Sequence, residues 1–424
     1  MLVMGGIVGA GIFANPSEVA HRVHTPFLIL GVWVLGGFIA MCGAFIWAEL
    51  ATRLPGTGGQ YLYLREAYHP SVAFVYGWGL LLVTQTGGMA AVAVIFASYF
   101  RGLTGLGWSD SALAAIVLLS LTAINCFGAR VGSNVQSVLM LLKIVALAAL
   151  VVLGLALGGG SLKSGPLLGE PVSFGLLKGI GGAMVPIAFA YGGWQTASFV
   201  AGEMRDARRD LSRGLLMGVA GVITLYLAVN IACLRVLGPA GLAATATPAS
   251  DVMRAVLGER GAQWIAVAIA ISTLGFLSQS MLTGPRVYYA MARDGLFFES
   301  VGKLSRRSRA PVVAIVLQGI AAIVIACSGT YGEILNFAVT VDFIFFGMTA
   351  ASLFISRQRE IGSGSAIYRV PGHPFTTILF VLSCAGIVGS AIVASPANSA
   401  IALGIMLAAL PVYYYWSRFK RAHR

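Results

Sequence analysis

Charged residues are scarce in this sequence: aspartate, glutamate, lysine and arginine together make up only 10% of its 424 residues. Soluble domains average about 25% charged residues, so a soluble protein of this size would have too little polar surface to cover its core. Hydrophobic residues make up 58% of the chain, and its mean hydropathy is +0.86. The composition therefore excludes an ordinary soluble protein and predicts a membrane protein.

Cysteine and histidine are also rare, with five of each. An odd number of cysteines at scattered spacing fits neither a disulfide framework nor a metal site, so we interpret them as small buried hydrophobic residues. No group of histidine, cysteine and acidic residues has metal-ligand spacing, and no nucleophile–base pair emerges. The sequence therefore gives no support for catalysis, a bound metal or a cofactor. The cysteines are Cys42, Cys126, Cys233, Cys327 and Cys384.

Hydrophobic runs of about 20 residues, the length that crosses a ~30 Å hydrocarbon core, recur along the chain with short polar gaps. They predict an all-α membrane protein with twelve transmembrane helices. The first run has no basic leader, so we do not expect a cleavable signal peptide. The spans are expected near residues 1–21, 26–52, 71–100, 110–127, 134–158, 176–203, 213–237, 261–292, 311–328, 331–356, 375–394 and 399–417.

Lysines and arginines are distributed unequally between the two sides that these spans define. With residue 1 in the cytoplasm, twenty lie on the inner side, seven on the outer side and Lys143 within a span, which together make the 28 of the sequence. Because cytoplasmic loops carry the excess of positive charge, both termini are expected in the cytoplasm. The net charge of +13 then reflects topology and attraction to anionic lipid, and no nucleic-acid partner is expected.

Two gaps between spans have the composition of short helices. Residues 53–70 mix small, aromatic and charged residues and are expected to form an amphipathic helix at the cytoplasmic face. Residues 245–258 contain Thr247-Pro248 before Asp251, which is a helix-start signature. We expect this second segment to form an external helix over the mouth of the bundle.

Glycines interrupt the first and the sixth span, at Gly9-Ala10-Gly11 and at Tyr191-Gly192-Gly193. A break inside the bilayer exposes backbone N–H and C=O groups where no water can satisfy them, so breaks persist where they line a cavity. Paired breaks in the two halves of a chain are typical of the binding site of a secondary transporter.

The positions of the breaks predict an inverted repeat. They lie five spans apart, so one broken helix runs outward and the other inward, as an inverted five-plus-five arrangement requires. We therefore expect a first repeat at 1–158, a second, inverted repeat at 176–356, two further helices at 375–417 and a basic cytoplasmic tail at 418–424.

The first break allows three interpretations. Gly9-x-Gly11-x-x-Ala14 matches a dinucleotide-binding fingerprint, but that motif follows a strand and precedes an acidic residue by about 20 positions. Only eight residues precede it here, and the next acids are Glu18 and Glu49. Alternatively, the glycines only permit close helix packing. In the third interpretation, free N–H groups at the start of a half-helix accept a carboxylate.

The second break has the opposite polarity. Pro186 removes a helical hydrogen bond, and Gly192 and Gly193 each lower helix propensity by roughly 1 kcal/mol. Free carbonyls at the end of a half-helix suit an ammonium group, although a kink without a ligand is an alternative. Together the two breaks predict a receptor for a zwitterion, with N–H donors for its carboxylate and C=O acceptors for its amine.

Five segments, in order along nearly the whole chain, resemble the amino acid–polyamine–organocation superfamily, and the fourth is close to its L-type amino acid transporter branch. These segments are Gly6-Ile7-Val8-Gly9-Ala10-Gly11-Ile12-Phe13; Ala48-Glu49-Leu50 with Pro55, Gly58, Gly59 and Tyr61; Gly77-Trp78; Phe189-Ala190-Tyr191-Gly192-Gly193-Trp194; and Gly284-Pro285-Arg286 with Ala292-Arg293-Asp294-Gly295.

The resemblance implies a leucine-transporter-like fold that carries amino acids by alternating access. It also implies that the substrate carboxylate is held by Ile7, Val8, Gly9, Ala10 and Gly11. The amine would be taken by Phe189, Ala190, Tyr191 and Gly192, with the Phe189 ring as external gate. Ala10 stands where many relatives have serine, so a hydroxyl contact is missing. Relatives also have a longer inner half of the first helix, which implies a truncated or misassigned start.

Two ionisable residues lie deep within predicted spans. Lys143 in a span centre costs about 2.5–3.5 kcal/mol on insertion scales, so it should face the interior and find a partner such as the free carbonyls of the first helix. A snorkelling structural lysine is the alternative. In relatives a lysine at this position occupies the place of a sodium ion between helices 1 and 8, which implies sodium-independent transport. Asp342 could titrate during transport, or only cap a helix or pair with an arginine.

Three further acids, Glu49, Glu203 and Asp294, lie near arginines at predicted cytoplasmic helix ends. They could form an ion-pair network that closes this side, or they could be solvated surface charges.

We therefore expect an amino acid permease of a bacterial inner (cytoplasmic) membrane, working by exchange or proton symport. A neutral L-amino acid is the expected substrate, because the predicted pocket segments carry neither an acid nor an arginine. A cationic amino acid or polyamine carrier is the alternative, and a channel, a membrane-embedded enzyme or a non-transporting amino acid sensor are alternatives of other classes.

The expected partners are the substrate and the lipid bilayer. Residues 101–110 lack the cysteine through which some relatives attach a heavy chain, so no disulfide-linked partner is expected. We expect a monomer or a weak homo-oligomer.

Overall fold

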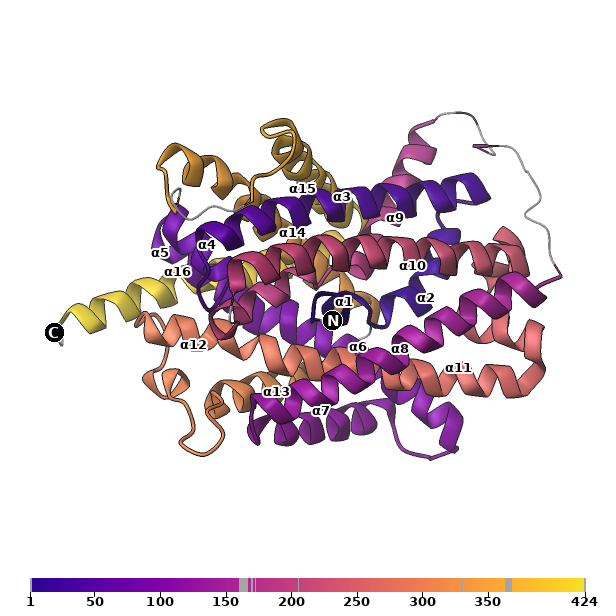
Figure 1. Ribbon diagram of the computed structural model, residues 1–424, viewed down its shortest axis with the longest axis horizontal. Coiled ribbons are helices and arrows are strands. Elements are labelled where there is room, and N and C mark those ends of the chain that lie inside the picture. The colour runs from indigo at the N-terminus through magenta and orange to yellow at the C-terminus, as the bar shows by residue number, and fades with distance from the viewer. Residues whose placement is uncertain are drawn as a thin grey trace.

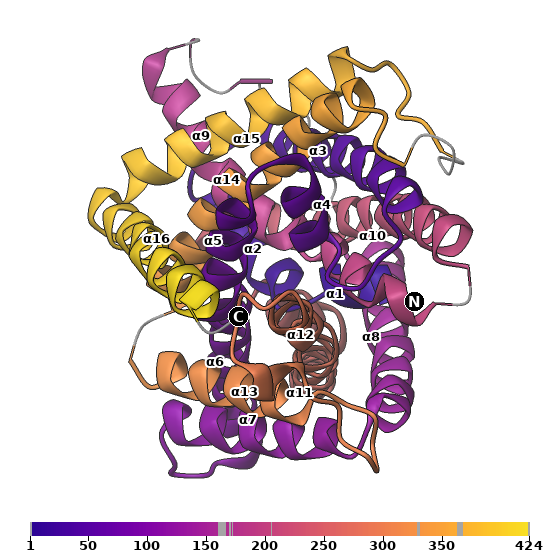
Figure 2. The same cartoon turned by 90° about the vertical axis from the view of Figure 1, so that its left-hand side faces the viewer.

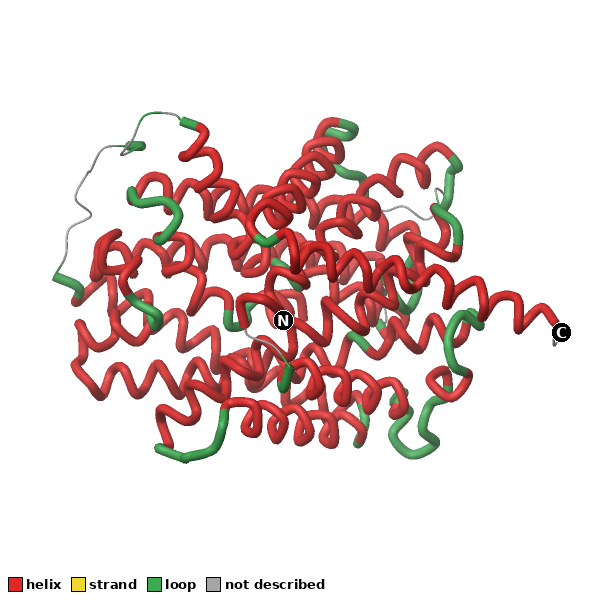
Figure 3. The backbone as a smooth tube through the Cα atoms, turned by 180° about the vertical axis from the view of Figure 1, so that it is seen from behind, coloured by secondary structure: helices red, strands yellow, loops and turns green. Residues whose placement is uncertain are grey.

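The structure is a computed structural model that describes residues 2–159, 167–168, 171, 173–204, 206–328, 331–362 and 368–422. Every regular element in these ranges is a helix, as Figure 3 shows. The α-helices are α1 (Leu2–Ile7), α2 (Gly11–Ala20), α3 (Pro26–Arg53), α4 (Gln60–Ala67), α5 (Pro70–Gly79), α6 (Gln85–Thr104), α7 (Asp110–Cys126), α8 (Ala129–Leu157), α9 (Phe174–Tyr191), α10 (Ala207–Ala244), α11 (Pro248–Thr283), α12 (Pro285–Arg293), α13 (Val312–Ala326), α14 (Tyr331–Gln358), α15 (Phe375–Ala394) and α16 (Pro396–Ala422). Three further elements are the π-helix η1 (Leu80–Thr84) and the 3₁₀-helices η2 (Trp194–Glu203) and η3 (Glu299–Gly302).

Most of the long helices run roughly along one direction and form a bundle (Figure 1). The C-terminus, α4 and α12 lie at one end of this bundle, and we call it the C-terminal end (Figure 1). Viewed from that end, α1 and α2 lie in the middle, surrounded by longer helices (Figure 2). Helices α3 and α10 pack on each other, as do α8 and α11, so the broken first helix is enclosed by long helices.

The length and composition of the helices identify a multi-pass membrane protein. Within the described residues, nine helical stretches are long and apolar enough to cross a membrane, and α7 and α13 are shorter apolar helices. Large apolar side chains lie exposed on the outside of the bundle, including Trp264 (77% exposed) and Leu382 (63%). Such a surface would be costly in water and is the normal surface of a protein in lipid.

Local sequence signals explain where several helices begin. Thr25 precedes Pro26, and its hydroxyl oxygen accepts a hydrogen bond from Leu28 N (3.1 Å), so α3 has both an N-cap and a proline in its first turn. Ser173 caps α9 in the same way through Leu176 N (3.2 Å).

Both predicted short helices are present. Helix α4 lies within the gap 53–70, and α11 begins at Pro248, directly after the Thr247-Pro248 signal. The second of these helices is not separate, because it continues into the following span through a bend at Gly258 (φ 71°). The span expected near 213–237 is also longer, since α10 runs from Ala207 to Ala244 with a bend at Gly238 (φ 67°).

The third span contains an element that the apolar pattern does not indicate. Between α5 and α6 the chain forms the π-helix η1, and the Thr86 hydroxyl donates to Leu81 O (2.6 Å). A π-helical turn widens the helix by one residue and is frequent at functional sites. Here Thr84 is the last residue of η1 and Gln85 follows it, and both residues line a cavity in the centre of the bundle.

Candidate functional site

A cavity lies in the middle of the bundle, between the two helix breaks. Its volume is about 70 Å³, several times the space that one buried water molecule needs. Its walls come from five regions: α1–α2, η1 with the start of α6, α9 with η2, α11, and α14. A space of this size suits a small guest.

The first break leaves N–H groups free on one side of the cavity. Helix α1 ends at Ile7 and α2 begins at Gly11, with Val8, Gly9 and Ala10 outside both helices. The N–H groups in the first turn of a helix have no intrahelical acceptor, and they form the positive end of its dipole. Gly9, Ala10 and Gly11 line the cavity, so the start of α2 presents this positive end to a guest.

The carbonyl groups of the same break are occupied by two distant side chains. Lys143 of α8 is completely buried, and its ammonium group donates to Val8 O and to Gly5 O (3.4 Å). The Tyr226 hydroxyl of α10 lies 3.2 Å from Ile7 O. The prediction that a buried lysine pairs with the carbonyls of the broken first helix is therefore confirmed.

Lys143 also reaches α11. A Cβ atom on Gly275 would lie 3.4 Å from Lys143 Cε and 3.6 Å from its Nζ, so the lysine fits between the first break and α11. A Cβ at position 275 would be in ordinary van der Waals contact with the Lys143 side chain and in tighter contact, at 3.2 Å, with Leu139 Cβ.

The second break is held mainly by its own residues. Gly193 has φ 102°, a conformation that favours glycine, and its N–H donates to the Gln195 side chain (2.9 Å). Gly193 O accepts from the backbone N–H (3.2 Å) and the hydroxyl (2.7 Å) of Thr196. Helix α9 thus ends at the cavity, where the negative end of its dipole faces the positive end of α2.

The two breaks touch each other. A Cβ atom on Gly193 would lie 2.1 Å from Gly6 O, and a Cβ on Gly11 would lie 2.9 Å from Ala190 Cα. Tyr226 joins them as well, because its hydroxyl lies 3.2 Å from Ile7 O and 3.3 Å from Ala190 O. Only glycine permits this close approach of two backbones.

Seven of the nine residues expected to bind substrate line the cavity: Ile7, Gly9, Ala10, Gly11, Phe189, Ala190 and Gly192. Val8 and Tyr191 lie outside its wall. Val8 O accepts from Lys143, and the Tyr191 hydroxyl donates to Trp33 O (3.2 Å) while its ring packs edge-on against Trp33. The Tyr191 side chain thus packs against α3.

Several residues of the cavity wall were not part of the predicted site. Thr84, Gln85, Gln195, Thr196 and Ser280 add polar groups, and Phe276, Phe343 and Phe346 add aromatic surface. Thr84 and Gln85 are adjacent polar residues in an otherwise apolar span. This pattern is the sequence signal that indicates a role for these two residues in the cavity.

Asp342 also lines the cavity. The neutral substrate is predicted from the two broken segments, which contain no acid. The structure brings an acid from α14 to the same space, so the absence of an acid in those segments does not make the cavity free of acids.

Ion pairs connect distant helices at the C-terminal end. Glu49 is fully buried and is bound by Arg53 (2.9 Å), Arg357 (2.6 Å) and the backbone N–H of Val370 (2.8 Å). Its burial excludes the alternative that Glu49 is a solvated surface charge. Glu203 pairs with Arg286 at 2.8 Å.

Asp294 is the third acid at this end, and it binds Arg65 and the Tyr61 hydroxyl (2.8 Å). Burial, and next the Asp294 carboxylate, raise the pKa of Tyr61, which therefore stays protonated and donates to the acid. The pair ties α4 to the end of α12.

Metal and disulfide chemistry find no support in the described part of the chain. No group of three or more metal-binding side chains occurs there, and the five cysteines are free thiols.

The sequence matches a known protein family. The family model described as amino acid permease matches residues 1–416. The chain belongs to the amino acid permease family. This permease is 30% identical over 417 residues to a serine/threonine exchanger of Bacillus subtilis, covering 97% of this chain and 94% of the relative. It is 27% identical to the human large neutral amino acids transporter small subunit 2, over 98% of this chain and 79% of the relative. It is 28% identical to the mouse b(0,+)-type amino acid transporter 1, over 84% of this chain and 74% of the relative.

Proposed function

We propose that this permease transports amino acids by alternating access, with the central cavity as its substrate site. The observation that carries the proposal is the convergence of two broken helices on one small cavity, with the start of α2 and the end of α9 both in its wall. A zwitterion matches this arrangement, because its carboxylate is favoured at the N-terminal end of a helix dipole and its ammonium group at the C-terminal end.

In the proposed binding mode, the carboxylate meets the N–H groups of Gly9, Ala10 and Gly11. The amine meets carbonyl oxygens at the end of α9, near Phe189 and Gly192. Val8 and Tyr191 take supporting roles, the first as a ligand of Lys143 and the second as a packing residue. The Phe189 ring lies in the cavity wall, where it can act as the external gate.

The proposed topology has twelve spans. It adds the broken pair α1–α2 and the short helices α7 and α13 to the nine long stretches. We assign residues 1–158 and 176–356 to two inverted repeats in a leucine-transporter-like fold, 375–417 to two additional helices and 418–424 to a basic tail. The excess of lysine and arginine supports an inner (cytoplasmic) membrane location with both termini cytoplasmic.

Transport is proposed to be independent of sodium. The Lys143 ammonium group binds the carbonyls of Gly5 and Val8, which would otherwise be free to coordinate a cation. An ammonium group at this place removes both the ligands and the electrostatic reason for a sodium ion. We also propose that the protein works without a disulfide-linked heavy chain, as a monomer or weak homo-oligomer.

A neutral amino acid is the first candidate substrate, in keeping with the names of the two relatives that specify serine, threonine or large neutral amino acids. Asp342 favours a second candidate, a cationic amino acid or polyamine, because a carboxylate in the cavity wall can pair with a positive side chain. Asp342→Asn separates the two: it should abolish uptake of lysine or putrescine if Asp342 binds a cation, and retain binding of neutral amino acids.

The transport proposal is tested with purified full-length protein in proteoliposomes. Vesicles loaded with unlabelled L-threonine, L-leucine or L-lysine are diluted into the same labelled amino acid, with sodium or choline outside. The expected result is saturable uptake that internal substrate stimulates and that choline leaves unchanged. Non-saturable flux would identify a channel, binding without flux a sensor, and a strict sodium requirement would contradict the role of Lys143. Repeating the assay with an imposed proton gradient distinguishes exchange from proton symport.

A further inference from the structure

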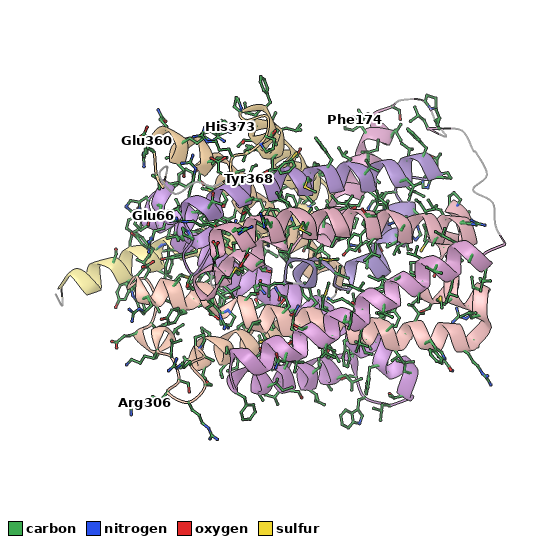
Figure 4. The ribbon with its side chains drawn as sticks, viewed as in Figure 1. Glu66, Phe174, Arg306, Glu360, Tyr368 and His373 are labelled. Carbon is green, nitrogen blue, oxygen red and sulfur yellow. The ribbon has the colours of Figure 1, made fainter. Side chains whose placement is uncertain are left out.

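A second cavity, of about 650 Å³, lies at the C-terminal end of the bundle. Its walls come from the residues that follow α7, the first turns of α12, the connection between α12 and α13, the end of η2 at Glu203, and Thr57 before α4. Figure 4 shows this connection, marked by Arg306, at the same end as Glu66 and Glu360. The central cavity shares no lining residue with it.

Positive charge dominates the wall of this second cavity. Three arginines, Arg286, Arg307 and Arg309, line it together with one acid, Glu203. Arg286 is paired with Glu203 at 2.8 Å. Within the part of the chain that the structure describes, no carboxylate forms a salt bridge with Arg307 or Arg309. Two guanidinium groups are therefore left to attract an anion.

The segment that carries these arginines is held in a defined turn. Ser305 N donates to Ala310 O (2.9 Å), and Arg309 N donates to Ser305 O (2.9 Å). The turn also rests on the end of α7, because a Cβ atom on Gly128 would lie 3.1 Å from Ser308 O. Because the backbone of this turn is already fixed, less conformational entropy is lost when its arginines bind a ligand.

Apolar groups border the same cavity. Phe127 at the end of α7 is 76% exposed, and Leu304 is 48% exposed. Helix α7 is an apolar helix at the outer edge of the bundle, as Figure 2 shows. A ligand in this cavity would therefore meet arginines on one side and lipid-facing apolar side chains on the other.

We propose that this cavity binds the headgroup of an anionic phospholipid, with its phosphate at Arg307 and Arg309 and its chains beside Phe127. Guanidinium groups bind phosphate through paired N–H donors, and basic pockets between membrane helices are suited to anionic headgroups. The exposed apolar border favours a lipid over a soluble phosphate, which gains nothing from contact with Phe127 and Leu304.

Native mass spectrometry of the full-length protein in a neutral detergent tests the proposal. Dioleoyl phosphatidylglycerol is the probe, and dioleoyl phosphatidylcholine is the uncharged comparison. We expect wild-type protein to retain phosphatidylglycerol selectively, and the Arg307→Gln/Arg309→Gln variant to bind it about thirty-fold more weakly. Each single variant should give a smaller loss, which keeps the test informative if the double variant is unstable.

Arg306→Gln is the matched control, because Arg306 is in the same turn but does not line the cavity. It should bind phosphatidylglycerol like the wild type. If Arg306→Gln weakened phosphatidylglycerol binding as much as the double variant, the lipid would be held by diffuse surface charge, and the proposed site would be refuted. Full displacement of the lipid by millimolar inorganic phosphate or glycerol phosphate would assign the cavity to a soluble anion instead. Unchanged binding in the double variant would also refute the proposal.

Discussion

The two helix breaks satisfy their backbone groups in different ways. At the first break, side chains from distant helices occupy the carbonyls: Lys143 binds Val8 O and Gly5 O, and the Tyr226 hydroxyl lies near Ile7 O. At the second break, the partners of Gly193 lie two and three residues farther along the chain, at Gln195 and Thr196.

This difference indicates which break depends on the rest of the bundle. We expect the first break to persist only while α8 and α10 hold their places, so that a movement of either helix changes it. The second break is encoded locally by a glycine with positive φ and by its neighbours. Tyr226 contacts both, so it adds a side-chain link to the direct backbone contact between the two breaks.

Lys143→Ala should have the largest effect on transport. It removes the charged donor of two buried carbonyls, and hydrogen bonds to charged groups contribute about 1.5–3 kcal/mol each. We expect counterflow to fall by about a hundredfold. Leu142→Ala is the control, since Leu142 is the preceding residue and is 45% exposed on the outside of α8. Wild-type kinetics in Lys143→Ala would show that the first break does not depend on α8.

Gly193→Ala should damage the second break by steric strain. The added Cβ would lie 2.1 Å from Gly6 O, and φ 102° is unfavourable for alanine. We expect a loss of at least about 1–3 kcal/mol in stability, measured as a lower melting temperature in detergent. Gly389→Ala in α15 is the control, because no atom lies within 4 Å of its added Cβ and it should be neutral or slightly stabilising. An unchanged melting temperature for Gly193→Ala would refute the contact between the breaks.

Tyr226→Phe should weaken both breaks moderately. The change removes one hydroxyl that lies near two carbonyls, for which we expect a loss of about 1 kcal/mol and a several-fold fall in transport. Tyr288→Phe provides the comparison, since the Tyr288 hydroxyl is buried without a hydrogen-bond partner among the described residues. If both variants lose the same activity, the bridge between the breaks has no specific role.

Gln195→Ala should have the smallest effect. It removes the acceptor for Gly193 N but leaves the glycine and both Thr196 contacts in place. We expect less than a threefold fall in transport, because one neutral hydrogen bond contributes about 0.5–1.5 kcal/mol and water in the cavity can replace it. A loss as large as that of Lys143→Ala would contradict the local stability of the second break.

Much of the fold could be predicted from the sequence, because its signals are local. Long apolar runs, the two glycine breaks and the Thr247-Pro248 helix start needed no knowledge of distant contacts. The partner of Lys143 was predictable as well, since a charge inside a span must find polar groups and the broken first helix supplies them.

The remaining parts of the site depend on contacts between distant segments. Tyr226 lies in an ordinary apolar helix, and only the assembled bundle brings its hydroxyl to Ile7 and Ala190. The sequence identifies Asp342 as an intramembrane acid, but its place in the cavity wall depends on how α14 packs. The Tyr191 side chain turns toward Trp33, which the periodicity of its helix does not predict.

The most direct test of the central claim, that the two breaks bind the two charged ends of one small molecule, compares three ligands by thermal shift. These are the amino acid identified by counterflow, its methyl ester, which lacks the carboxylate, and its deaminated acid, which lacks the amine. Binding raises the melting temperature by mass action. We expect stabilisation only by the intact amino acid, in wild-type protein and not in Gly193→Ala. Equal stabilisation by either analogue would show that one of the two breaks does not contact the substrate.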